Sequence, residues 1–343
     1  MQDVTLIGID LGKHSFHVHG QDRHGKALLR KKFNRKQLIE FFATFHTCKV
    51  VMEACAGAHH MARQLAGFGH DVKLISPQFV RPFVKTNKND FVDAEAICEA
   101  ASRPSMRFVT PKNEAQQTLS ALHRVRESLV RDRTKAGNQI HAFLLEFGIS
   151  LPIGYAAVRH LPGILTEHAL PPRLIRMLER LHAHFKYLDE QIAAIEKDLT
   201  SQLADDDLGQ RLMSVPGIGP ITASVLASEV GDGKQYRCGR DFAAALGLVP
   251  RQYSTGGKNN LLGISKRGDK NLRRLLVQCA RAYMQRLARQ TGPLAHWVSA
   301  MLTRRHSNVV ACALANKMAR IAWAIAAHHA TFEMKEAPTS MLA

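Results

Sequence analysis

A stretch in the C-terminal half of the chain combines hydroxyl groups, glycines and cations. In residues 247–276, Ser254 and Thr255 stand directly before Gly256 and Gly257. Two glycines allow positive φ and close backbone approach, so that consecutive N–H groups can face an anion. The cations that could hold a phosphate are Arg251, Lys258, Lys266 and Arg267. The pattern indicates a nucleophilic serine that handles a phosphodiester, although Ser-Thr-Gly-Gly is also ordinary turn chemistry.

Four carboxylates in the N-terminal third have a spacing that suits a metal site. Asp10 and Glu53 each end a short apolar run, while Asp90 and Asp93 lie three residues apart on one face of a predicted helix. Each acid alone is more simply a solvated side chain or a helix cap. Together, four like charges would repel one another strongly without cations between them. Hard oxygen donors therefore predict Mg²⁺ or Mn²⁺, and we expect two ions.

The elements expected around these acids form an α/β layer with a mixed sheet. Apolar or alternating runs predict strands at residues 4–10, 14–20, 26–33, 49–52 and 72–75, and helical spacing predicts intervening helices. Open α/β sheets place their sites at the ends of strands, where Asp10 and Glu53 stand. This layout resembles that of ribonuclease-H-like nucleases. Histidines 14, 17, 59 and 60 are interpreted as surface or core residues and receive no role.

Residues 113–203 have the composition of long helices. The second half holds a heptad repeat, which pairs with another helix. The repeat consists of Leu174, Leu178, Leu181, Phe185, Leu188, Ile192, Ile195 and Leu199, and its expected mate at residues 119–147 repeats Leu122, Leu129, Ala136 and Phe143. The proline-rich residues 148–172 are expected to be a turn or loop. We expect an antiparallel arm with contacts to a second molecule; a hairpin closed within one chain fits the pattern equally.

Positive charge is concentrated in the C-terminal part. The formal net charge is +18, and residues 234–320 hold 17 Lys and Arg against two Asp. Such a surface favours a polyanion bound in a salt-dependent way, with nucleic acid as the first expectation. The Pro-Gly-Ile-Gly at residues 216–219 resembles a helix-hairpin-helix turn that offers N–H groups to a DNA backbone. The predicted nucleic-acid contacts are Gly217, Gly219, Arg251, Lys258, Lys266, Arg267, Lys270, Arg273 and Arg274.

Composition limits the class of protein further. The length of 343 residues and the 45% apolar content predict a folded, multi-domain protein. The six cysteines contain no C-x-x-C pair, which favours reduced thiols over a zinc site or a disulfide framework. The N-terminus lacks the build of a signal peptide, and we expect no membrane-spanning run. The expected location is the cytoplasm.

The acids Asp10, Glu53, Asp90 and Asp93, together with Ser-Thr-Gly-Gly and the Gly-Ile-Ser-Lys-Arg-Gly of residues 263–268, resemble a known enzyme family. They are similar to the DEDD transposases of the insertion-sequence family numbered one hundred and ten, most of all its eleven-eleven subgroup. The resemblance covers nearly the whole chain. It implies an α/β RuvC-like catalytic domain at residues 1–110, an α-helical coiled-coil arm at 111–204, and a mainly α-helical transposase domain at 205–343 with the helix-hairpin-helix-like segment.

The resemblance also implies an activity. It is the cleavage and exchange of donor and target DNA strands, guided by a non-coding bridge RNA, by a homo-oligomer (dimer or tetramer) in the bacterial cytoplasm. The four acids would bind Mg²⁺ or Mn²⁺, and a serine nucleophile, assigned to Ser254, would form a covalent phosphoserine. Thr255 is the rival hydroxyl, since related loops carry two serines.

Two other functions fit parts of the pattern. A RuvC-like, metal-dependent nuclease or junction resolvase would use the acids alone, with Ser254 shaping a turn. A non-enzymatic scaffold would use only the basic domain and the arm to bind nucleic acid. A covalent protein–DNA adduct excludes the first alternative, and metal-dependent cutting excludes the second.

Overall fold

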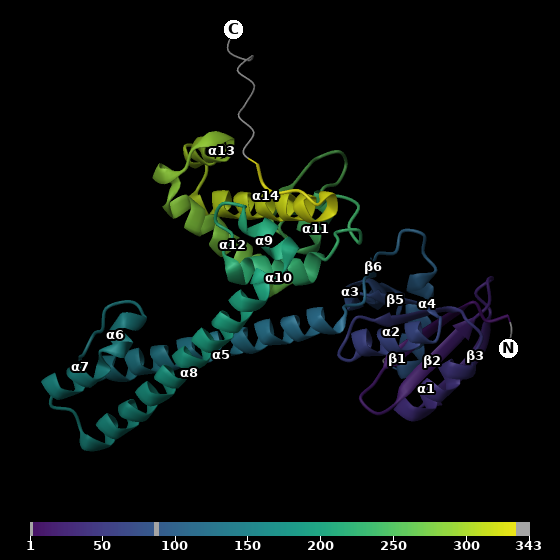
Figure 1. The fold of residues 1–343 in the computed structure, drawn as a ribbon, viewed down its shortest axis with the longest axis horizontal. Coiled ribbons are helices and arrows are strands. Elements are labelled where there is room, and N and C mark those ends of the chain that lie inside the picture. Colours follow the sequence, from purple (N-terminus) through teal and green to yellow (C-terminus); the bar gives the residue numbers. More distant parts are fainter. Residues whose placement is uncertain (1–2, 86–88, 334–343) are drawn as a thin grey trace, which may run out of the picture. The chain divides into compact units, whose positions relative to one another are not determined.

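The protein is described from a computed structural model, which covers residues 3–85 and 89–333. The chain divides into two compact units, Met1–Gln117 and Thr118–Ala343 (Figure 1). The first unit is a mixed α/β fold, and the second is mostly helical. The expected α/β N-terminal part and helical C-terminal part are therefore confirmed, whereas the finer division into three domains stays a prediction.

A six-stranded mixed sheet forms the centre of the first unit, in the order β3-β2-β1-β4-β5-β6. Its central strand β1 pairs antiparallel with β2 and parallel with β4. The strands are β1 (Leu6–Leu11), β2 (Phe16–Gln21), β3 (Ala27–Phe33), β4 (Lys49–Glu53), β5 (Asp71–Ile75) and β6 (Phe108–Val109). The first five match the sequence prediction closely. The antiparallel β6 was not predicted, because a strand of two residues is too short to show alternation.

Helices cover both faces of this sheet. Helices α1 (Arg35–Thr44) and α2 (Ala58–Gly67) pack on the face that carries Ile7 and Ile9. Helix α4 (Asp90–Ala101) packs on the opposite face, beside Leu6 and Val51, together with the short α3 (Pro77–Val80) and the turn η1 (Arg81–Phe83). The two faces thus have separate cores, as strict alternation along β1 requires.

Gly8 sets the distance between α4 and β1. A Cβ atom at this position would lie 2.4 Å from the carbonyl oxygen of Ala94 and 2.9 Å from Sγ of Cys98, both on α4. Only glycine allows this approach of the helix to the strand. The first turn of α4 is thereby held over the end of β1.

Two long helices, α5 (Glu114–Leu145) and α8 (Pro172–Ala204), pair antiparallel within the second unit (Figure 1). Ala136, Ile140 and Leu144 on α5 pack with Leu178 and Phe185 on α8 in one buried cluster. Closure within the chain is therefore present. The predicted contact positions on α5 were partly wrong. Ala136 belongs to the cluster and the half-buried Phe143 packs against it. Leu122 and Leu129 are only half-buried and lie outside it, because the buried stripe follows steps of four residues.

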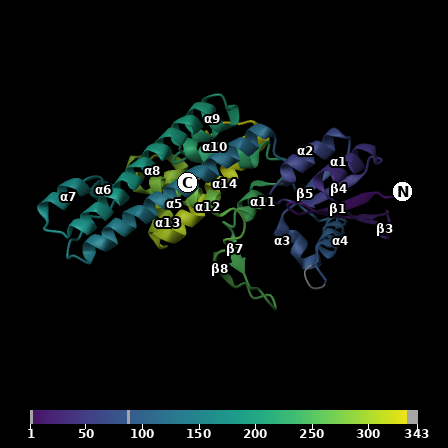
Figure 2. The ribbon, with the colours of Figure 1, turned by 90° about the horizontal axis from the view of Figure 1, so that it is seen from below.

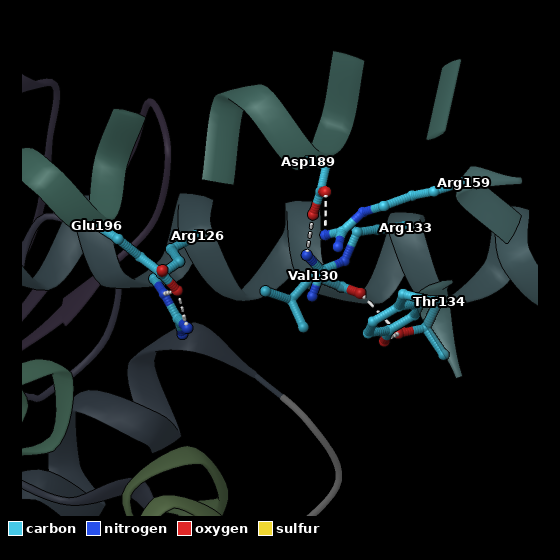
Figure 3. Close-up of polar contacts among 8 residues, drawn as sticks. Arg126, Val130, Arg133, Thr134, Arg159, Asp189 and Glu196 are labelled. Carbon is cyan, nitrogen blue, oxygen red and sulfur yellow. Dashed lines mark hydrogen bonds and ion pairs between the residues drawn. The ribbon is translucent and has the colours of Figure 1, made fainter. Parts of the chain in front are cut away.

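Two charged contacts join the paired helices, and a third joins α8 to Arg159 in the segment between them (Figure 3). Arg126 on α5 donates to Glu196 on α8 through Nε at 2.9 Å. Further along, Asp189 on α8 accepts from Arg133 on α5 and, at 2.6 Å, from Arg159. These two guanidinium groups lower the pKa of Asp189 against the opposing effect of its burial. Such contacts between partly buried groups fix the register of the pair.

The segment between the two long helices is not the plain loop that its prolines suggested. It contains α6 (Tyr155–Arg159) and α7 (Leu161–Glu167). Pro162 lies in the first turn of α7 and Pro172 begins α8. Proline is tolerated at these positions because the first N–H groups of a helix have no partner in the helix. The prolines here start helices and do not prevent them.

The rest of the second unit is a helical body with one hairpin. The helices are α9 (Asp207–Met213), α10 (Pro220–Val230), α11 (Gly239–Ala245), α12 (Lys270–Gln285), α13 (Gly292–Leu302) and α14 (Ser307–His328), with the turn η2 (Leu287–Arg289). They share one large core. Strands β7 (Pro250–Gln252) and β8 (Leu261–Ile264) form an exposed antiparallel hairpin that extends from this body (Figure 2). The sequence predicted a loop here, because the strands are short and carry no buried alternation.

Helix α14 is long and apolar enough to cross a membrane by length and composition, contrary to the sequence expectation that no such run exists. Half of its most apolar window is buried inside the fold. Residues such as Leu314, Met318 and Ala322 lie in the core of the second unit. The apolar character of α14 is thus explained by its position as the central core helix.

Candidate active site

Strand register places three chemically active side chains on the same face of the sheet. Asp10 lies opposite His17 in the β1–β2 pair. Gly8 lies opposite Val51 in the parallel β1–β4 pair. Asp10 and Glu53 each follow these residues by two positions, so their side chains lie on the same face of the sheet. That face is the one covered by α4. The strand ends of β1 and β4 therefore present their acids to the first turn of α4, as the sequence predicted.

Asp10, His17 and Asp90 form the tightest group. One ligand atom from each lies within 4.8 Å of the others. Nδ1 of His17 is 3.4 Å from Oδ2 of Asp90, and the imidazole is buried while the carboxylate is half exposed. Among the described residues this buried Nδ1 has no hydrogen-bond partner. A polar atom left in this state beside two carboxylates suits a group that binds a cation.

Glu53 and Asp93 lie outside that tight group but belong to the same electrostatic site. Burial raises the pKa of Glu53, and the charges of Asp10 and Asp93 raise it further. Burial, Glu53 and Asp10 also raise the pKa of the Cys55 thiol. The like charges of Asp10, Glu53 and Asp93, three of the four predicted acids, therefore act on one another, and a cation among them would relieve this repulsion.

His17 is a residue that the sequence interpretation missed. It was treated as a surface or core histidine, which its burial partly supports. Its edge contact with Phe91, with ring centroids 4.6 Å apart, holds the ring beside the start of α4. A signal existed in the sequence: a short connection between two antiparallel strands places the first residues of the second strand opposite Asp10.

Ser254 lies at the end of the exposed β7–β8 hairpin, in the second unit. Its Oγ accepts from Nε2 of Gln252 at 2.7 Å and from the backbone N–H of Asn260 at 3.3 Å. It lies 3.4 Å from Oδ1 of Asn259, to which the hydroxyl donates. Both residues beside the turn, Ser254 and Thr255, are exposed. The hydroxyl of Ser254 is oriented by three polar neighbours and open to a large substrate.

The two glycines form the tip of this hairpin. Thr255 and Lys258 form a bridge, with the Lys258 N–H donating to the Thr255 carbonyl at 3.0 Å. Gly256 has a φ of 55° and Gly257 a φ of 76°. Positive φ at both central residues is what a two-residue hairpin turn requires. Both glycines are exposed, and a Cβ atom on either would meet nothing within 4 Å.

The predicted nucleic-acid contacts differ in their surroundings. Arg251, Lys258, Lys266, Arg267 and Lys270 are exposed. Arg273 instead donates through Nη1 to the carbonyl of Leu246 at 2.8 Å and more weakly to Arg267 and Asp269. It therefore holds the loop before α12 in place. Arg274 donates to Asn271 at 2.7 Å and is only partly exposed.

The two glycines of the helix-hairpin-helix-like turn lie close to α12. Gly217 has a φ of 91°, and a Cβ there would lie 2.9 Å from the carbonyl oxygen of Cys279 on α12. Gly219 precedes α10, and its backbone N–H group faces the thiol of Cys279. The turn packs against α12, which explains the glycine at position 217 without a ligand, whereas Gly219 has a φ of −98° and a Cβ there would meet nothing within 4 Å. Contact between this turn and a phosphate stays a prediction.

Comparison with known proteins identifies the family. A family model described as "Transposase" of the DEDD IS110 type matches residues 7–149, which include all four predicted acids. A second, described as "Transposase IS116/IS110/IS902 family", matches residues 209–293, which include Ser254.

Three curated relatives are similar along nearly their whole length. The transposase for insertion sequence element IS1328 of Yersinia enterocolitica is 67% identical over 97% of this chain and 99% of its own. A probable family 20 transposase of Pseudomonas aeruginosa is 48% identical over 94% of this chain and 97% of its own. The transposase for IS1111A of Coxiella burnetii is 41% identical over 97% of this chain and 92% of its own. The chain therefore belongs to the IS116/IS110/IS902 family of DEDD insertion-sequence transposases, enzymes that cleave and rejoin DNA.

Proposed function

We propose that this transposase exchanges DNA strands through a covalent phosphoserine on Ser254, with a metal site at Asp10, Glu53, Asp90 and Asp93 and with a non-coding bridge RNA as guide. The observation that carries the proposal is the convergence of Asp10 and Asp90 around the unpartnered Nδ1 of His17, within the electrostatic reach of Glu53 and Asp93. Like charges gathered at the ends of two parallel strands and at the start of α4 suit the binding of the metal ions used in phosphate chemistry.

The first unit is proposed to be a RuvC-like, ribonuclease-H-like catalytic domain. Its central β1 lies between an antiparallel β2 and a parallel β4, and the acids leave β1 and β4 on the side of α4. This mixed order supports the assignment. The paired α5 and α8 are likewise proposed to act as a coiled-coil arm that contacts a second copy.

The family implies a divalent metal ion, and we propose Mg²⁺ or Mn²⁺. Four carboxylates supply the hard oxygen ligands that these ions prefer, and His17 adds a nitrogen that Mn²⁺ accepts more readily than Mg²⁺. A bound ion would stabilise the negative charge that develops on the phosphate during attack. The residues present fit such an ion.

Ser254 would act as the nucleophile. Its Oγ forms a bond to phosphorus, the bond from phosphorus to the leaving DNA oxygen breaks, and the hydroxyl proton ends on that oxygen. Gln252, Asn259 and Asn260 orient the hydroxyl. Since the phosphoserine conserves the energy of the phosphodiester, a DNA hydroxyl can reverse the step on another strand.

Other parts of the proposal concern partners and location. The exposed Arg251, Lys258, Lys266, Arg267 and Lys270 would neutralise phosphates of donor DNA, target DNA and bridge RNA. We propose a dimer or tetramer as the active form. We also propose a cytoplasmic location, with which the six free cysteines agree.

The decisive experiment is the trapping of the covalent adduct. Ser254→Ala should abolish both strand cleavage and a denaturant-resistant protein–DNA adduct on a nicked insertion-sequence end, whereas the matched neighbour change Thr255→Ala should retain both in part. Mass spectrometry should place the phosphate on Ser254. A phosphate on Thr255, or normal cleavage by Ser254→Ala, contradicts the assignment. Sequencing of RNA that co-purifies with the protein tests the guide.

A metal-dependent nuclease without a covalent intermediate is the second candidate. It is favoured by the turn at Gly256 and Gly257, whose positive φ values an ordinary hairpin explains. In that case Ser254→Ala would still cut in the presence of Mg²⁺, and no adduct would form with either variant.

A further inference from the structure

A cleft of about 1350 Å³ lies in the second unit, on one side of the base of the β7–β8 hairpin. Its walls come from the start of α11, from both hairpin strands, from Trp297 on α13 and from one side of α14. The cleft is larger than a typical small-molecule pocket, which has roughly 300–1,000 Å³. Its dimensions suit an extended ligand that enters and leaves.

Helix α14 has two faces, and only one of them belongs to the core. Val310, Leu314 and Met318 are buried. The other face repeats at steps of three and four residues and lines the cleft, with Val309, Cys312, Ala313, Asn316, Lys317 and Arg320. The 52% exposure of Val309 shows that this face is open. The stripe provides small and apolar groups flanked by cations.

The charge of the cleft has one sign. Five cations line it, namely Arg240, Arg251, Lys266, Lys317 and Arg320, and no Asp or Glu is among its lining residues in the described part of the chain. Lys317 lies over the ring of Trp297, with Nζ 4.6 Å from the ring centroid. Cations gathered without carboxylates repel one another, and a polyanionic ligand removes this repulsion.

The lining also contains apolar and aromatic surface that a phosphate backbone does not need. Trp297, Leu262 and Val309 contribute it, beside the small Ala313 and Cys312. A DNA duplex presents its phosphates outward and keeps its bases stacked inside, so it would leave this surface unused. A single strand offers phosphates to the cations and unpaired bases to the apolar floor and the aromatic ring.

We propose that this cleft binds single-stranded DNA, as the track for the strand next to the phosphodiester that is cut. Arg251 and β8 belong both to the cleft and to the hairpin that carries Ser254, so the two features are continuous. DNA is chosen over RNA because the enzyme family acts on DNA and the hairpin is the proposed reaction site. The inference rests on the proposed function only for that last point.

Binding of a fluorescein-labelled thymidine oligonucleotide of about 15 nucleotides tests the cleft. The full chain is used with Ser254→Ala, so that covalent capture cannot contribute and failure of the serine assignment leaves the result unaffected. In this background Arg320→Glu and Lys317→Glu should each weaken binding at least tenfold. Trp297→Ala should weaken it by roughly fivefold to a hundredfold, the range for loss of one base stack.

Arg305→Glu is the matched control. Arg305 is exposed, lies between α13 and α14 and does not line the cleft. It makes the same change of net charge and should weaken binding less than threefold. Since Trp297 and Lys317 are both partly buried, circular dichroism must show their variants folded. Arg320 is exposed, and its variant decides the matter if they are not.

Four results would overturn the proposal. Equal losses for Arg320→Glu and Arg305→Glu would reduce the effect to net charge. If the cleft variants lost affinity only for a uridine oligoribonucleotide, the cleft would bind RNA. If they lost affinity only for a DNA duplex, the cleft would not be a single-strand site. Photocrosslinking of an iododeoxyuridine strand should identify peptides of α13 or α14, and crosslinks found only elsewhere would contradict the cleft.

Discussion

At the scale of single residues, the acid cluster combines like charges with a buried imidazole nitrogen, Nδ1 of His17, that has no hydrogen bond among the described residues. Asp10 contributes to the raised pKa of Glu53, and its oxygen lies within 4.8 Å of ligand atoms of His17 and Asp90. Without a cation the repulsion among these charges lowers the stability of the fold. With a bound cation the same charges stabilise the fold. The same residue should therefore affect stability in opposite directions in the two states.

Asp10→Asn tests this relation. Without metal the variant should be as stable as the wild type or more so, by up to about 1 kcal/mol, because one like charge is removed. In Mn²⁺ the wild type should gain thermal stability while Asp10→Asn gains little and loses strand cleavage. Calorimetry with and without Mn²⁺ measures both effects. Asp71→Asn is the control, because it makes the same change at the opposite end of the parallel strands, and it should keep the gain in thermal stability in Mn²⁺. An equal gain in Asp10→Asn and in the wild type would exclude Asp10 as a ligand.

At the scale of elements, the site depends on how closely α4 approaches β1. Gly8→Ala would place a methyl group 2.4 Å from the Ala94 carbonyl oxygen. Overpacking of this kind costs about 1–3 kcal/mol, and it should also shift Asp90 and Asp93 away from Asp10. Hydrogen exchange should then speed up in α4 and β1, with loss of cleavage. Gly67→Ala is the control, since a Cβ there meets nothing within 4 Å. Unchanged hydrogen exchange in Gly8→Ala would show that α4 and β1 can relax to accommodate the methyl group.

A buried histidine joins α5 to α10 and makes that junction sensitive to acid. Nε2 of His123 lies 3.0 Å from Oγ of Ser224, and burial, aided by Arg126, lowers the pKa of His123 from 6.5 to about 4. Between pH 6.5 and about 4, His123 is therefore protonated in the unfolded chain and neutral in the folded chain. Stability is complete above pH 6.5 and falls as the pH drops through the window down to about 4, by on the order of 3 kcal/mol.

His123→Gln should remove most of this acid sensitivity, because a neutral amide does not titrate. Denaturant unfolding between pH 7 and about 4.5, followed by fluorescence, measures it. Both tryptophans of the chain, Trp297 and Trp323, lie in the second unit and report on it. His184→Gln, an exposed position on α8, should keep the wild-type slope. Parallel slopes for His123→Gln and wild type would place the acid sensitivity elsewhere.

At the scale of the whole molecule, positive charge is concentrated in one part of the second unit. Residues 234–320 hold 17 Lys and Arg against two Asp, whereas residues 1–117 hold 17 Lys and Arg against 11 Asp and Glu. The second unit should therefore bind DNA alone, and its affinity should fall by roughly a thousandfold between 50 and 200 mM salt if six phosphates are contacted. Filter binding of separate fragments measures this. Similar, salt-insensitive affinities for both fragments would show that charge does not direct binding.

The boundary of that fragment follows from the tertiary structure and not from the sequence pattern. A cut at residue 205, where composition changes, would separate Leu203 from the core that it shares with α9 and α10. Likewise Leu188 and Ile192 look like contacts to another molecule in the sequence, yet both are buried. Charged substitutions there would disrupt the fold itself and say little about oligomerisation.

The sequence by itself predicted the first five strands of the first unit and the helices between them, because apolar alternation and helical spacing are local signals. It also marked the four acids and the serine loop as candidates for the site. Tertiary structure alone decided which residues meet. His17 joins the acids only through the β1–β2 register, and Arg273 holds a loop through carbonyl groups that precede it by up to 27 residues. The cleft beside α14 needs residues from five elements, from Cys238 to Ala324. Contacts between residues so distant in the chain depend on packing, which no local pattern records.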